Sequence, residues 1–165
     1  MWGREEEARR FAEKAKPDER IPPTAWEGLV DLGDEPDSSL EKILSLTKKI
    51  ISHEHNSWPP DEWWDKNTPG WILGKNIKKL TEAEALENLE LWRTDPSVEL
   101  PWGFFSWIEA LRDRMWLWHG YEVHGSQMRL VLDTVEIPPR ITAYKQLIIA
   151  AGGEFVSERW PVLDH

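Results

Sequence analysis

The feature that most constrains the fold of this chain is the pattern of residues 127–160. It begins with apolar residues at every second position, Met128, Leu130 and Leu132. Alternation of this kind is typical of a strand with one buried face, and it predicts a strand over 127–136. A double proline follows and ends that strand, because proline cannot donate to a hydrogen-bond ladder.

The rest of this region continues the pattern. Residues 140–151 are apolar on nearly every side of a helix, which requires cover from more than one direction. Gly152 and Gly153 supply a left-handed cap at the end of that helix. Residues 154–160 then predict a closing strand. The end of the chain is therefore expected to form a strand–helix–strand unit, with a right-handed crossover if its strands are parallel.

Three earlier stretches repeat apolar residues at helical spacing, and helices are predicted over 39–53, 81–93 and 104–118. Two of them begin with the capping-box pattern, in which a side chain at the N-cap and one three residues later satisfy each other's backbone N–H groups. These pairs are Ser38 with Glu41 and Thr81 with Glu84.

The remaining segments are less regular. Residues 4–15 predict a helix with a narrow apolar stripe, and the prolines of residues 16–37 predict a long loop. Residues 56–71 hold four tryptophans and three prolines, a composition that favours neither a regular helix nor a strand. We therefore expect the chain to comprise an N-terminal helix and proline-rich acidic segment, 1–37, and one globular α+β domain, 38–165. The expected fold class is α+β, a mainly helical body packed on a small sheet, with long loops rich in proline and tryptophan.

Charge and tryptophan content limit the classes of function. The 165 residues include 12 tryptophans and no cysteine, and the formal net charge is −10. The absence of cysteine excludes disulfides, thiolate zinc sites and thiol nucleophiles. The negative charge disfavours binding to nucleic acid and favours binding to a basic protein partner. The sequence has no secretory signal and no apolar run long enough to span a membrane, so a soluble, cytoplasmic protein is expected, with no membrane partner.

Acidic residues cluster at three places, and tryptophan is the residue most enriched at the energetic centres of protein interfaces. The expected partner-binding residues combine the two features. They are Asp31, Asp34 and Glu35 in the first acidic run, Asp61, Glu62, Trp63, Trp64 and Asp65 in the tryptophan-rich segment, and the stripe of Glu84, Glu87 and Glu90. Trp63 and Trp64 are expected to act as anchors, since an exposed indole can stack on a lysine or arginine while a carboxylate pairs with it.

Other chemistry has weaker support in the sequence. His53 and His55 are the best candidates for metal ligands, but zinc needs three or four ligands and no recognisable spacing supplies the others. The carboxylates beside Trp63 and Trp64 also fit a carbohydrate cleft. No nucleophile motif, phosphate loop or dinucleotide fingerprint is present. No catalytic residue, metal or cofactor is therefore predicted.

The end of the chain also resembles the C-terminal part of some small immunity proteins. The likeness rests on Gly120-Tyr121, Leu130-Val131-Leu132-Asp133, Pro138 and the run Tyr144 to Glu154 that contains the double glycine. Immunity proteins of this kind neutralise bacterial polymorphic or contact-dependent growth-inhibition toxins. The resemblance covers about a quarter of the chain, carries no binding residues over, and implies a cytoplasmic, non-enzymatic inhibitor of one cognate toxin.

The composition favours the same function. A toxin domain that cuts nucleic acids is commonly basic, and an acidic inhibitor is steered towards it. We therefore expect the chain to act as an immunity protein that occludes a basic toxin domain, and we expect that domain to be a nuclease. Two alternatives stay open: a protein that binds a small molecule or carbohydrate through its tryptophans, and an adaptor that has no toxin partner.

Overall fold

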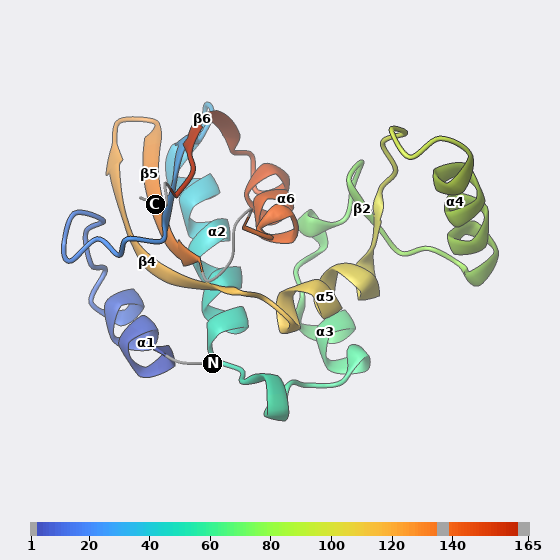
Figure 1. Ribbon diagram of the computed structural model, residues 1–165, viewed down its shortest axis with the longest axis horizontal. Coiled ribbons are helices and arrows are strands. Elements are labelled where there is room, and N and C mark those ends of the chain that lie inside the picture. Colours follow the sequence, from blue (N-terminus) through green and yellow to red (C-terminus); the bar gives the residue numbers. More distant parts are fainter. Residues whose placement is uncertain (1–2, 135–138, 162–165) are drawn as a thin grey trace.

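The computed structural model describes residues 3–134 and 139–161, and it shows an α+β fold built around a four-stranded sheet (Figure 1). The strands lie in the order β4-β5-β1-β6, and each neighbouring pair is antiparallel. They are β1 (Ala25–Asp31), β4 (Trp116–His124), β5 (Gln127–Thr134) and β6 (Glu154–Arg159). A second, parallel pair joins β2 (Ile77–Lys78) to β3 (Trp102–Gly103). The α-helices are α1 (Arg4–Ala12), α2 (Pro36–Ile51), α3 (Asp61–Asn67), α4 (Glu82–Thr94), α5 (Phe104–Arg112) and α6 (Thr142–Ala150), with short 3-10 helices at His55–Ser57 and Gly70–Ile72.

The predicted strand–helix–strand unit is confirmed as β5, α6 and β6. Both strands run antiparallel to β1, which lies between them, so they are parallel to each other. The Gly153 N–H donates to the Ile148 carbonyl oxygen at 2.9 Å, and the Gly152 N–H to that of Ile149 at 3.0 Å. Gly152 has a φ of +109°, so this helix stop needs glycine. The end of the predicted strand, 135–136, and Pro138 lie outside the described residues.

The prediction of a long loop over 16–37 is wrong, because residues 25–31 form β1 in the middle of the sheet. Trp26, Gly28 and Val30 face the core and alternate with half-buried neighbours. The glycine hides this alternation in the sequence, yet the packing requires it: a Cβ at Gly28 would lie 2.5 Å from the Trp26 ring. The N-terminal segment therefore contributes a strand to the same sheet as the C-terminal unit.

Helices α2 and α6 bury their apolar sides in one common core with the sheet (Figure 1). The Thr47 and Tyr144 hydroxyl oxygens lie 2.8 Å apart there, so these two buried hydroxyls satisfy each other. The helix predicted over 39–53 is α2, but the capping box at Ser38 and Glu41 is wrong, because the helix already begins at Pro36. Proline suits the first turn, where its missing N–H would have no helical partner.

The helix predicted over 104–118 is confirmed only as α5, because the chain ends that helix at Arg112 and enters β4 at Trp116. Met115 and Trp118 continue the helical spacing, which explains the error. Residues 116–120 are all buried, so no alternation marks the start of the strand. Strands covered on both faces read as continuous apolar runs, which periodicity alone cannot distinguish from a buried helix.

Helix α1 covers the β4 edge of the sheet through buried charged groups. The Arg114 guanidinium donates two hydrogen bonds to the Glu7 carboxylate, at 2.7 and 2.8 Å, and the Trp118 N–H donates a third at 2.7 Å. The buried Arg10 donates to the His119 carbonyl oxygen at 2.5 Å. These bonds attach the beginning of the chain to a strand more than 100 residues later.

Candidate binding surface

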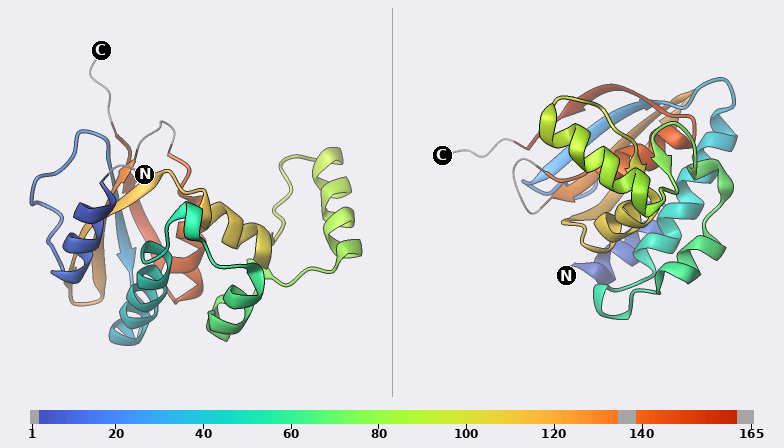
Figure 2. Two further views of the ribbon diagram at one scale, coloured as in Figure 1. Left: turned by 90° about the horizontal axis from the view of Figure 1, so that it is seen from below. Right: turned by 90° about the vertical axis from the view of Figure 1, so that its right-hand side faces the viewer.

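One segment stands apart from the rest of the molecule. Residues 79–101, here called the arm, leave the body after β2, form α4 and return at β3 (Figures 1 and 2). The base of the arm is closed by the β2–β3 pair and by the Trp102 N–H, which donates to the Asn76 carbonyl oxygen at 2.7 Å. The arm is therefore fixed at its two ends, while α4 lies away from the core.

The capping box predicted for α4 is confirmed. The Glu84 N–H donates to the Thr81 hydroxyl at 3.1 Å, and the Thr81 N–H donates to the Glu84 carboxylate at 3.3 Å. This reciprocal pair defines where the helix begins. At the other end, hydrogen bonds from the Ser97 hydroxyl and N–H lower the pKa of Asp95, so that carboxylate stays charged.

None of the thirteen residues of α4, all of which the structure describes, is buried. Several are large and apolar: Leu86, Leu89, Leu91 and Trp92 are 61%, 42%, 48% and 52% exposed. A helix of this length is marginal in water without tertiary packing. An isolated helix with this many exposed apolar side chains is typical of an element that packs against another molecule.

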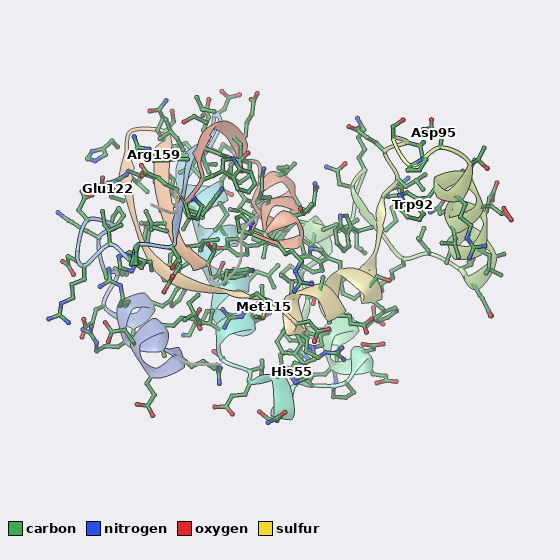
Figure 3. All side chains as sticks on the ribbon, viewed as in Figure 1. His55, Trp92, Asp95, Met115, Glu122 and Arg159 are labelled. Carbon is green, nitrogen blue, oxygen red and sulfur yellow. The ribbon has the colours of Figure 1, made fainter. Side chains whose placement is uncertain are left out.

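The arm and the body enclose an apolar groove of about 630 Å³. On α4 its wall is Ala85, Asn88, Leu89 and Trp92, and Figure 3 shows Trp92 on the side of the helix that faces the body. The other wall comes from the two ends of the arm, β3 and the first turn of α5. Its residues are Leu80, Leu100, Pro101, Trp102, Gly103, Phe104, Phe105 and Ser106. We call this cavity the arm groove.

The arm carries an excess of negative charge, although no acidic side chain lines the arm groove itself. The arm contains six acidic residues and two basic ones. The acids are Glu82, Glu84, Glu87, Glu90, Asp95 and Glu99, and the bases are Lys79 and Arg93. At about 100° per residue, Glu87 and Glu90 point to the face opposite Leu89 and Trp92, whereas Glu82 and Glu84 lie nearer the groove. The predicted Glu84, Glu87 and Glu90 are all exposed.

The tryptophan-rich segment differs from its prediction in two ways. It is not irregular throughout, because residues 61–67 form α3, with Asp61 and Glu62 in the first turn, where acids favour the helix dipole. Trp64 cannot anchor a partner, since it is fully buried and its ring stacks on Trp58 at 4.6 Å. Trp63 is half-buried. The remaining carboxylates, including Asp65, which pairs with Lys79, are exposed.

The third acidic group lies where β1 leads into α2. Asp34 and Glu35 are exposed there, and the half-buried Asp31 accepts a hydrogen bond from the Gly33 N–H at 2.9 Å. The β1–α2 connection and the arm are far apart in both Figure 1 and Figure 2. The three predicted groups therefore do not form one surface.

Sequence reasoning missed the residues that line the arm groove. The sequence predicts one apolar side for the helix over 81–93, made of Ala85, Leu86, Leu89 and Trp92, and such a side by itself predicts core packing. The structure places three of these residues in the wall of the groove and leaves Leu86 outside it. What this pattern could not reveal is that, within the part of the chain that the structure describes, no element of the body buries this side of α4. Trp92 and Trp160 are the two clearly exposed tryptophans among those that the structure describes.

The two candidate metal ligands have separate environments. His53 contacts the rings of Trp58, Trp63 and Trp64, at centroid distances of 6.3, 5.0 and 5.8 Å. Burial lowers the pKa of His53, and the nearby Arg4 lowers it further. His55 instead lies 3.0 Å from the Asp113 carboxylate. Within residues 3–134 and 139–161, no three His, Asp or Glu side chains gather in a way that would hold a metal ion.

Comparison of this chain with protein-family models, with curated proteins and with solved structures finds no match. Across the described part of the chain, no helix combines the length and apolar character needed to cross a membrane.

Proposed function

We propose that this protein is a non-enzymatic inhibitor of the immunity type, which binds a basic protein toxin in the cytoplasm and blocks it. The observation on which this proposal chiefly rests is the exposure of α4, which has four large exposed apolar side chains and no buried residue. An element of this kind gains stability from a second molecule, and inhibition by occlusion needs only such contact.

The charge distribution supports a basic partner. The chain carries a net charge of −10, and the arm alone has six acids against two bases. A field of this sign accelerates the encounter with a cationic protein and slows the encounter with an acidic one. A nuclease domain, whose substrate is a polyanion, has the required positive surface.

The experiment is co-expression of the full chain with the product of the reading frame directly upstream of its gene. We expect that product to inhibit growth when it is expressed alone, and we expect this chain to restore growth and to co-purify with it. The measured association rate should fall with added salt.

Failure to restore growth and to co-purify would contradict the inhibitor function. Co-purification with a basic partner that has no effect on growth would instead identify the chain as an adaptor. Quenching of tryptophan fluorescence by a small molecule or sugar, with no protein partner, would favour the ligand-binding alternative.

A further inference from the structure

We infer that the arm groove is the docking site for an amphipathic, positively charged helix of the partner protein. This inference rests on the proposed function, since it names the part of the partner that is recognised. Its basis is the juxtaposition of the exposed apolar face of α4 with the exposed Phe105 and Ser106 in the first turn of α5, across an apolar groove.

The spacing of the lining residues on α4 suits a helical occupant. Ala85, Leu89 and Trp92 are spaced by four and three residues, so they form a ridge along one face of α4. Phe105, 42% exposed, belongs to the opposite wall. A third helix laid between the two walls would insert its own ridge of apolar side chains beside that of α4. The part of α4 that lines the groove, from Ala85 to Trp92, spans about 12 Å, so about two turns of a partner helix would be covered.

The apolar walls explain why the occupant needs an apolar side. Trp92 is 52% exposed and Leu89 is 42% exposed, although both face the groove. Burial of these side chains against apolar groups of the partner would remove them from water. Aromatic side chains of this kind supply a large share of binding energy at the centre of an interface.

Charge selects the occupant. No acidic side chain lines the groove itself, but Glu82 and Glu84 flank the lining face of α4 and Glu99 lies on the returning segment. The two bases of the arm are Arg93, also at the flank of this face, and Lys79, whose ammonium lies 5.9 Å from the Phe104 ring, so acids outnumber bases around the groove. A helix with lysine or arginine along the margins of its apolar side would meet opposite charge. A second copy of this chain would bring its own arm, again with six acids against two bases, and like charges placed together oppose association.

The test uses the full chain and three labelled peptides of 18 residues. The first peptide is an amphipathic helix of leucine and lysine, the second has glutamate in place of lysine, and the third has the leucine–lysine composition in a scrambled order without helical periodicity. Fluorescence anisotropy gives the Kd of each. We expect the first to bind at least about tenfold more tightly than the other two.

A matched pair of variants places the binding site. In the arm variant, Trp92→Ala is combined with Leu89→Ala. In the control variant, Trp160→Ala is combined with Val156→Ala. This variant removes an aliphatic side chain on β6 (56% exposed) and an indole directly after that strand (47% exposed), both outside the arm. We expect the arm variant to weaken binding of the amphipathic cationic peptide at least about tenfold and the control variant to leave it within about twofold.

Circular dichroism and thermal unfolding report whether each variant folds. All four substituted side chains are exposed, so the melting temperature should stay close to that of the unchanged protein. A Leu89→Lys variant gives a second measurement at the same wall of the groove. It should abolish binding of the cationic peptide without loss of the fold.

Three results would overturn the inference: equal weakening by the arm and control variants, equal binding of the scrambled peptide, or a concentration-dependent dimer that the arm variant abolishes. Growth rescue separates this inference from the proposed function. If the arm variant rescues cells as well as the unchanged chain, the docking site is wrong and the inhibitor function stands. If the amphipathic cationic peptide binds the groove but the full chain fails to rescue, the docking site stands and the inhibitor function is wrong.

Discussion

The substitution Glu7→Gln tests the attachment of α1 to the sheet. Glu7 is 2% exposed and Arg114 is 6% exposed, so the ion pair between them is almost fully shielded from water. The substitution keeps the size of the side chain and one carbonyl oxygen, but it removes the negative charge that balances Arg114. Removal of one partner of a buried ion pair costs about 3–5 kcal/mol, because the other charge stays buried without compensation.

That cost is large beside the total stability of a domain, which is about 5–15 kcal/mol. Urea denaturation followed by circular dichroism measures the free energy of unfolding directly. For a chain of this size, each kcal/mol lowers the melting temperature by about 2–4 °C, so we expect a decrease of roughly 6–20 °C.

Glu6→Gln is the matched control. Glu6 is the neighbouring residue on the same helix and forms a salt bridge with Arg9, but both side chains of that pair are about half exposed. The control should change the melting temperature very little, since exposed ion pairs contribute little to stability. Equal effects of the two substitutions, or a loss below about 1 kcal/mol for Glu7→Gln, would refute the reasoning that the buried charges attach α1 to β4.

Three further predictions concern the body and the arm. A Cβ at Gly120 would lie 2.7 Å from a carbonyl oxygen of the α1–β1 connection, so Gly120→Ala should lower the free energy of unfolding by about 1–3 kcal/mol, as measured by urea denaturation. A Cβ at Gly74 meets no atom within 4 Å, so the control Gly74→Ala should leave that free energy unchanged. Thr81→Ala removes the N-cap of α4 and should lower the amide-exchange protection of that helix by about 1 kcal/mol. The melting temperature of the body should not change, because α4 contributes no buried residue to the core. Burial lowers the pKa of His119, so protonation of this imidazole favours the unfolded chain. The stability of the protein should therefore fall as the pH decreases from about 6.5 through the pKa of His119 in the folded state. His119→Gln should make the melting temperature depend less on pH, as measured by thermal unfolding at each pH. If stability proves independent of pH between 7 and 5, the assigned direction for His119 is wrong.

The helix that forms one wall of the candidate surface could be predicted from the sequence, but the exposure of its apolar side could not. The capping box at Thr81 and the apolar spacing of Leu89 and Trp92 define α4 without any tertiary information. The same spacing predicts burial in the core, and the structure leaves these side chains exposed. Conversely, Trp64 lies in an acidic segment that favours a surface position, yet its ring is covered by Trp58 and the surrounding core.

The sequence alone determined the elements whose signals are local: α2, α4 and α6, the glycine stop after α6, and the strands β5 and β6. Their caps and periodicities lie within a few residues of one another, so they act before any distant part of the chain is placed. Only the tertiary structure decided that residues 25–31 join the centre of the sheet, that β4 follows α5, and which tryptophans face outward. These outcomes depend on contacts between residues far apart in the chain, such as those of Glu7 with Arg114 and Gly28 with Leu130. No local pattern contains that information, because the burial of a side chain depends on which distant elements pack against it as well as on its own residue type.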